Sequence, residues 1–91
     1  MIRRANIIIS GSVQGVFFRD HTKTKAKDLN LKGYVRNEPN GTVKIVVEGE
    51  EIQIQNLVDW CHKGSPSATV ESVDIEMLPP KYEFDTFKIV I

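Results

Sequence analysis

The sequence has little of what several large classes of protein depend on. Its single cysteine, Cys61, excludes an internal disulfide and a metal cluster built on several thiolates, and it is typical of proteins from a reducing cytosol. No apolar run approaches the roughly 20 residues that a membrane-spanning helix requires. The opening stretch, "MIRRANIIIS", has only a short apolar run and reads as a strand, not as a signal peptide. We therefore expect a cytoplasmic protein without a membrane partner.

The chain also has no excess of charge of either sign. Its 12 Lys and Arg residues balance 12 Asp and Glu residues. Nucleic-acid binding depends on a basic surface, so it is not predicted here. A local site for a small anion needs no net charge and remains compatible with this composition. The length of 91 residues predicts one domain spanning residues 1–91, with a monomer as the default state.

Hydrophobic periodicity predicts an alternation of strands and helices. The predicted strands cover residues 5–10, 33–37, 42–48, 72–77 and 87–91, and the predicted helices cover residues 18–29 and 50–63. Asn30 follows the first helix and is a residue that tolerates the left-handed conformation of a helix cap. Asn40-Gly41 predicts a hairpin between the second and third strands.

This order is β-α-β-β-α-β followed by a further strand. A helical crossover makes the first two strands parallel, and the hairpin allows the third strand to pair between them. The order predicts an α+β, ferredoxin-like two-layer sandwich, in which two helices cover one face of an antiparallel sheet. The third strand is expected to present Thr42, Lys44, Val46 and Glu48 outward. It offers no aromatic platform for single-stranded RNA.

The stretch "GSVQGVFFR", residues 11–19, links the first strand to the first helix. Gly11 and Gly15 permit backbone angles from which successive N–H groups can form a concave nest for phosphate. Arg19 lies near the positive end of a helix dipole, which is unfavourable unless an anion sits beside it. The alternative is that Arg19 reaches water or pairs with Asp20 or Asp28.

Asn37 ends the second strand at the same edge of the sheet as this loop, because the first two strands are parallel. Arg19 and Asn37 are therefore expected close enough together to share one ligand. An asparagine before a turn more often bonds local backbone, so a purely structural role is the alternative for Asn37. His21 and His62 are assigned no catalytic role.

Two stretches together resemble the signatures of the acylphosphatase family: "GSVQGVFFR" and "GYVRNEPNGTVKIVVEG", residues 33–49. "GSPSATVESVDI", residues 64–75, is similar to a third segment of that family, between the second helix and the fourth strand. The resemblance covers nearly the whole chain. It implies a strand order of 4-1-3-2-5 and hydrolysis of the carboxyl–phosphate bond of acyl phosphates.

The resemblance also implies the roles of individual residues. The catalytic residues of the family fall on Arg19 and Asn37. Its phosphate-binding loop, acting through backbone N–H groups, falls on Gln14, Gly15, Val16, Phe17 and Phe18. No metal or other cofactor is implied. The expected ligands are a small-molecule acyl phosphate and inorganic phosphate.

The chemistry of an acyl phosphate is compatible with so small a set of groups. Its carboxylate leaving group has a conjugate acid with a pKa of roughly 4–5, so no general acid is needed at neutral pH. Holding the phosphoryl oxygens and orienting a water molecule suffice. The alternative functions are a non-catalytic anion-binding module and an interaction domain with a vestigial phosphate site, because the fold by itself does not decide function.

Overall fold

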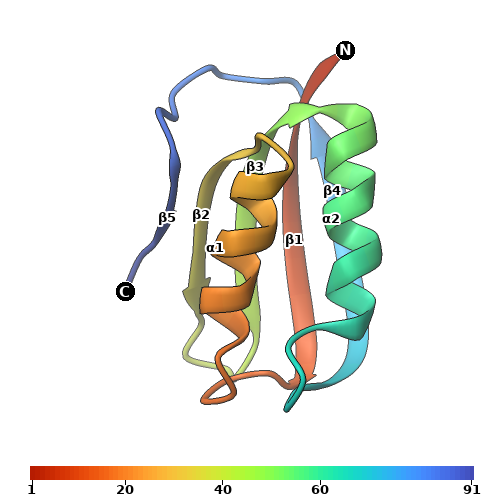
Figure 1. Cartoon of the computed structure of the whole chain (residues 1–91), viewed down its shortest axis with the longest axis vertical. Coiled ribbons are helices and arrows are strands. Elements are labelled where there is room, and N and C mark those ends of the chain that lie inside the picture. The colour runs from red at the N-terminus through yellow and green to blue at the C-terminus, as the bar shows by residue number, and fades with distance from the viewer.

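The computed structural model describes the whole chain, residues 1–91, and contains every predicted element. The element ends differ from the predicted ones by a few residues. In chain order, the elements are β1 (Ile2–Ser12), α1 (Phe18–Asp28), β2 (Lys32–Asn37), β3 (Val43–Glu50), α2 (Glu51–Lys63), β4 (Thr69–Leu78) and β5 (Phe87–Ile89) (Figure 1). Asn30 adopts a φ of 58°, which confirms the left-handed residue expected after the first helix.

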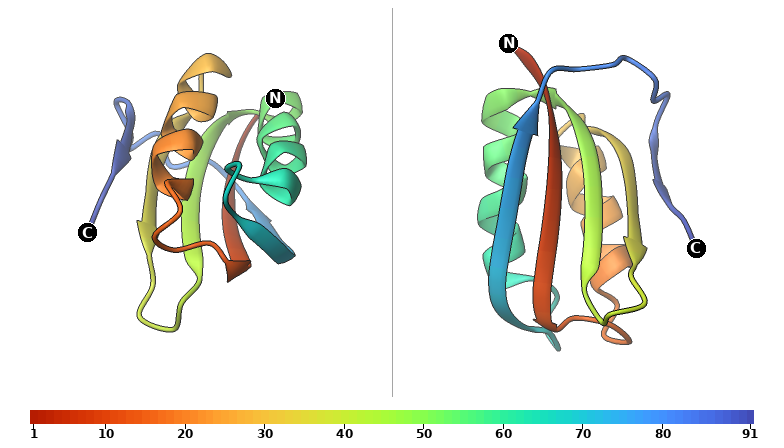
Figure 2. Two further views of the ribbon diagram at one scale, coloured as in Figure 1. Left: turned by 60° about the horizontal axis from the view of Figure 1, so that its bottom comes forward. Right: turned by 180° about the vertical axis from the view of Figure 1, so that it is seen from behind.

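The five strands form one sheet in the order β4-β1-β3-β2-β5, as expected. β1 pairs antiparallel with β3 and β4, and β2 pairs antiparallel with β3. The sheet is mixed and not wholly antiparallel as expected, because β5 pairs parallel with β2. The connection after β4 crosses from one edge of the sheet to the other at the end where β2 begins, so β5 enters in the direction of β2 (Figures 1 and 2).

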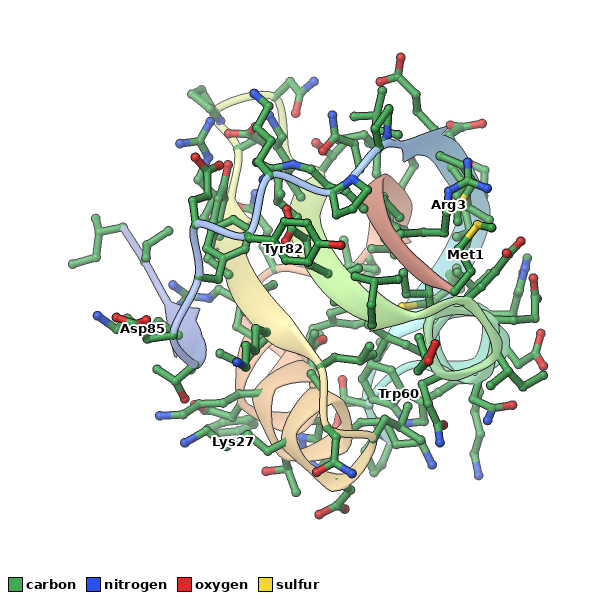
Figure 3. All side chains as sticks on the ribbon, turned by 90° about the horizontal axis from the view of Figure 1, so that it is seen from above. Met1, Arg3, Lys27, Trp60, Tyr82 and Asp85 are labelled. Atoms are coloured by element: carbon green, nitrogen blue, oxygen red, sulfur yellow. The ribbon has the colours of Figure 1, made fainter.

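Both helices cover the same face of the sheet, and the core lies between them and the strands (Figure 1). Trp60 lies on α2 at the junction with α1, where its ring packs against Phe18 with ring centroids 5.4 Å apart (Figure 3). Cys61 is fully buried in this core, and burial raises the pKa of its thiol to about 12. The thiol is therefore protonated at neutral pH and is no nucleophile.

The other face of the sheet differs from expectation at β3. Val46 and Glu48, expected to point outward into solvent, are 2% and 6% exposed. The Glu48 carboxylate accepts hydrogen bonds from Arg4 Nη1 at 2.9 Å and from the backbone N–H groups of Lys81 and Tyr82 at 2.9 and 3.0 Å. The connection between β4 and β5, which carries Tyr82 over the end of the sheet, therefore covers this carboxylate (Figure 3).

Glu48 keeps its negative charge in this setting. Burial alone disfavours the charged carboxylate, but the N–H groups of Lys81 and Tyr82 and the guanidinium of Arg4 more than offset that cost, so the pKa of Glu48 is lowered. Arg4 also pairs with Glu83 at 2.8 Å, which ties a second point of the connection to β1. One buried ion pair thus fixes the path of the chain towards β5.

We predict that Glu48→Gln lowers the free energy of unfolding by about 3 kcal/mol, because it removes the buried one of the two carboxylates that pair with Arg4 and leaves only the half-exposed Glu83. Urea denaturation monitored by circular dichroism measures this change. Glu71→Gln, at an exposed position on β4, is the matched control and is expected to alter stability by less than about 0.5 kcal/mol. Equal stabilities of the two variants would contradict the assigned role of Glu48.

The same ion pair predicts a dependence of stability on acid. Because the folded-state pKa of Glu48 lies below its ordinary value of 4.5, its contribution is complete above pH 4.5 and is lost as the pH falls through the lowered pKa. The unfolding free energy of the wild type is therefore expected to fall more steeply below pH 4.5 than that of Glu48→Gln. Parallel pH profiles for the two proteins would show that Glu48 is not the group responsible.

Candidate active site

The loop between β1 and α1 lies at the end of the sheet where β1 and β2 both finish. It runs beside the hairpin that joins β2 to β3, at the bottom of Figure 1 and in front in the left view of Figure 2. The predicted phosphate-binding residues 14–18 are the part of this loop after Val13 together with the first residue of α1. The parallel directions of β1 and β2 thus bring together two segments that are distant in the sequence.

The backbone φ angles of this loop alternate in sign. Gly15 has a φ of 74° and Phe17 a φ of 61°, whereas Val16 between them has no positive φ. Alternation of this kind turns successive N–H groups towards a common centre and forms an anion-binding nest. A side chain added at Gly15 would meet nothing within 4 Å, so the space above this residue is open, but its φ favours glycine.

The N–H groups of this loop have no acceptor within the protein. No backbone or side-chain oxygen accepts a hydrogen bond from the N–H groups of residues 14–18. The start of α1 has no side-chain cap either. Five consecutive donors at the positive end of a helix dipole are therefore free to bind an anion.

Arg19 is half-buried beside these donors. It lines a hollow of about 250 Å³, whose other lining residues are Val13, Gly15, Phe17, Phe18, Asp20 and Ile89. No carboxylate lies within 4.0 Å of its guanidinium, so the alternative in which Arg19 pairs with Asp20 or Asp28 is not realised. The cation shares its hollow with residues of the open loop.

Asn37 is the last residue of β2 and faces the same side of the sheet as the helices. It follows the alternation of Val35 and pairs across the strands with Val43, and both valines are fully buried. Its side-chain Oδ1 is buried and has no hydrogen-bond partner, so it does not bond local backbone. Asn37 does not line the hollow around Arg19, and no hydrogen bond joins the two side chains.

Gln14 has a contact that sequence reasoning missed. Its side-chain Nε2 donates to the carbonyl oxygens of Glu38 and Thr42 at 2.8 and 2.9 Å. These carbonyls belong to the hairpin that follows Asn37, so the side chain of Gln14 fastens the loop to the end of β2. Nothing in the sequence predicts a bond to backbone in another segment, since both acceptors are ordinary peptide groups.

The nearby His21 is bonded to the loop. His21 donates from its Nδ1 and from its backbone N–H to the carbonyl oxygen of Phe17, at 2.9 and 3.1 Å. No group of three or more His, Cys, Asp or Glu side chains is placed to hold a metal ion. With 11 and 13 residues, α1 and α2 are each too short to span a membrane.

Comparison with known proteins agrees with this arrangement. The profile of the acylphosphatase family matches residues 5–89. An acylphosphatase of Marinobacter nauticus is 46% identical over 87 residues, which are 96% of this chain and 95% of the relative. The crystal structure of acylphosphatase from Bacillus subtilis superposes on this chain with a TM-score of 0.94 and 33% sequence identity, and the match covers the full length of both chains.

A larger protein contains a similar domain. The structure of full-length HypF in its phosphate- and nucleotide-bound form matches 99% of this chain with a TM-score of 0.86 and 33% identity, but the match spans 12% of HypF. The family profile matches residues 5–89, a range that includes the loop, Arg19 and Asn37, and the Marinobacter nauticus relative aligns over nearly the full length of the chain. The chain therefore belongs to the acylphosphatase family, enzymes that hydrolyse acyl phosphates.

Proposed function

We propose that this chain hydrolyses the carboxyl–phosphate bond of an acyl phosphate with a specific division of roles. The N–H groups of residues 14–18 and the guanidinium of Arg19 hold the phosphoryl group, and Asn37 orients the attacking water. The observation that carries the proposal is the row of backbone donors without acceptors, next to a guanidinium without a carboxylate partner. Both lack a negative group, and a phosphoryl group supplies it.

Arg19 and the loop differ in what they contribute to holding the phosphoryl group. The N–H groups are fixed by the backbone and need no reorganisation as charge shifts during the reaction. The guanidinium adds a full positive charge and a planar fork that matches two phosphoryl oxygens. The apolar side chains of Val13, Phe18 and Ile89 line the same hollow and weaken the screening of these charges by water.

Asn37 is assigned to the water because of its unsatisfied oxygen. A buried carbonyl oxygen without a donor costs roughly 1–3 kcal/mol, and a water molecule bonded to it removes that cost. The carboxamide does not titrate, so its orienting role is independent of pH over the neutral range. The carboxylate product leaves without protonation, so the mechanism calls for no acid among the side chains.

The proposal extends to the setting of the reaction. It needs no metal, because the loop and Arg19 supply the positive charge that a cation supplies in other phosphoryl-transfer enzymes. We propose a cytoplasmic monomer of one domain that acts on a small molecule, without a nucleic-acid or membrane partner.

The second candidate function is a non-catalytic anion-binding module. The occurrence of a similar domain within the larger HypF favours this candidate.

The experiment that decides between these candidates is an assay of the purified chain with benzoyl phosphate in the presence of EDTA. We expect hydrolysis to benzoate and inorganic phosphate, with competitive inhibition by inorganic phosphate. Binding of phosphate without any turnover would identify the non-catalytic module. Turnover that disappears with EDTA and returns with a divalent cation would contradict the metal-free mechanism.

Replacement of Arg19 tests the assignment of phosphoryl binding. Arg19→Gln is expected to reduce kcat/KM by about 100-fold or more and to weaken the binding of inorganic phosphate, because the charge that meets the phosphoryl oxygens is removed. Lys23→Gln, one turn along α1, removes a positive charge without altering the loop and is expected to retain wild-type kinetics. Equal losses in both variants would mean that Arg19 acts through general charge alone.

Replacement of Asn37 separates water orientation from binding. Asn37→Ala is expected to lower kcat by about 100-fold while the inhibition constant of inorganic phosphate changes by less than about threefold. Asn56→Ala, at an exposed position on α2, serves as the control and should match the wild type. If Asn37→Ala turns over benzoyl phosphate at the wild-type rate, the assignment of Asn37 to the water is wrong.

A further inference from the structure

The connection between α2 and β4 contacts the back of the phosphate-binding loop. Ser65 lies in this connection, is 2% exposed, and donates from its Oγ to the carbonyl oxygen of Val16 at 2.8 Å. The residue before it, Gly64, packs so closely against Phe18 that an added Cβ would lie 2.7 Å from Phe18 Cε2. The end of α2 is therefore held against the start of α1 at this point.

Phe17, in the loop in front of this contact, has an unfavourable conformation. Its φ of 61° is the left-handed region, which is unusual for a bulky residue, and its side chain is 71% exposed, so burial of the ring does not compensate for the cost. Hydrogen bonds fix the peptide groups on both sides of it: Ser65 holds the carbonyl of Val16, and His21 holds the carbonyl of Phe17. Two neighbours thus maintain the strained residue.

The bond from Ser65 determines the direction of an N–H group. The peptide bond between Val16 and Phe17 is trans and planar, so its C=O and N–H groups point in opposite directions. With the carbonyl held towards Ser65, the N–H of Phe17 points away from that hydroxyl, and Phe17 itself lines the hollow together with Gly15 and Arg19.

We propose that Ser65 is a positioning residue of the phosphate-binding loop: its hydroxyl, by binding the Val16 carbonyl, aims the Phe17 N–H at the phosphoryl group. This inference rests on the proposed phosphoryl site and adds to it a residue from the third segment of the chain, outside the loop and the end of β2. Ser65 touches neither substrate nor water in this role and acts through the backbone of Val16 and Phe17.

Ser65→Ala removes this hydroxyl and adds no atoms to the buried site. We expect the dissociation constant for inorganic phosphate, measured by titration calorimetry, and the KM for benzoyl phosphate to rise by about three- to tenfold, the size of one hydrogen bond. Ser67→Ala, in the same connection but exposed, is the matched control and should bind phosphate as the wild type does. Ser65→Thr keeps the hydroxyl donor and should recover much of the affinity.

Amide spectra distinguish positioning from a merely structural role. In the wild type, added inorganic phosphate should shift the Phe17 amide proton downfield, and this shift should shrink in Ser65→Ala more than the shifts of its neighbours do. A variant that loses stability yet keeps wild-type phosphate affinity and the full Phe17 shift would overturn the proposal. A wild-type Phe17 amide that ignores phosphate while its neighbours respond would overturn it too, whether or not the variants fold.

The phosphate titration separates this inference from the proposed function. If the wild type binds phosphate but does not hydrolyse benzoyl phosphate, and Ser65→Ala weakens that binding, the proposed catalysis fails and the role of Ser65 stands. If the wild type hydrolyses benzoyl phosphate and Ser65→Ala binds phosphate equally well, the catalysis stands and the role of Ser65 fails.

Discussion

Backbone N–H groups that lack an acceptor are the feature around which this end of the molecule is built. The N–H groups of residues 14–18 bond no acceptor of the protein, and Gly15 and Phe17 are exposed, so these donors are open to water or to an anionic ligand. The left-handed Phe17 and the open space above Gly15 belong to the same feature, since both keep the donors turned outwards. Chemistry on a phosphoryl group then needs little more than a fixed positive surface and a positioned water.

The rest of the fold supplies the rigidity that such a surface needs. The loop is fastened to the β2–β3 hairpin by Gln14 and to the α2–β4 connection by Ser65, so two segments distant from it in the sequence hold it. At the opposite end of the sheet, the Arg4–Glu48 ion pair fixes the path of the chain towards β5. That strand brings Ile89 to the hollow beside Arg19, so a contact remote from the loop contributes to the shape of the site.

Most of the fold could be predicted from the sequence because it depends on local signals. Alternating valines and isoleucines indicated the buried face of β3, and Asn30 and Asn40-Gly41 marked the end of α1 and the hairpin correctly. The element order predicted that β3 lies between β1 and β2 and that the loop and the end of β2 share one edge of the sheet, whereas the full strand order was implied by the family resemblance. The parallel pairing of β5 was missed, since a long connection without periodic pattern gives no direction to the strand after it.

The polar contacts could not be predicted, and the reason is the same in each case. Glu48, Gln14 and Ser65 each bond groups that are distant in the sequence, and the partners are often backbone atoms that no side-chain pattern marks. A glutamate on the outer face of a strand is normally solvated, and only the folded connection over it makes Glu48 an exception. The sequence predicted that Arg19 and Asn37 lie at the same edge of the sheet. It did not predict that Arg19 lines a hollow which Asn37 does not reach.

The position of β1 in the middle of the sheet has a consequence for how the protein acquires its structure. Ile7 lies opposite Ile45 on one side and Ile75 on the other, so the strand nearest the start of the sequence is completed by one near its end. Joining such distant segments costs chain entropy before any contact between them is gained. The domain is therefore expected to assemble more slowly than a helical bundle of equal length.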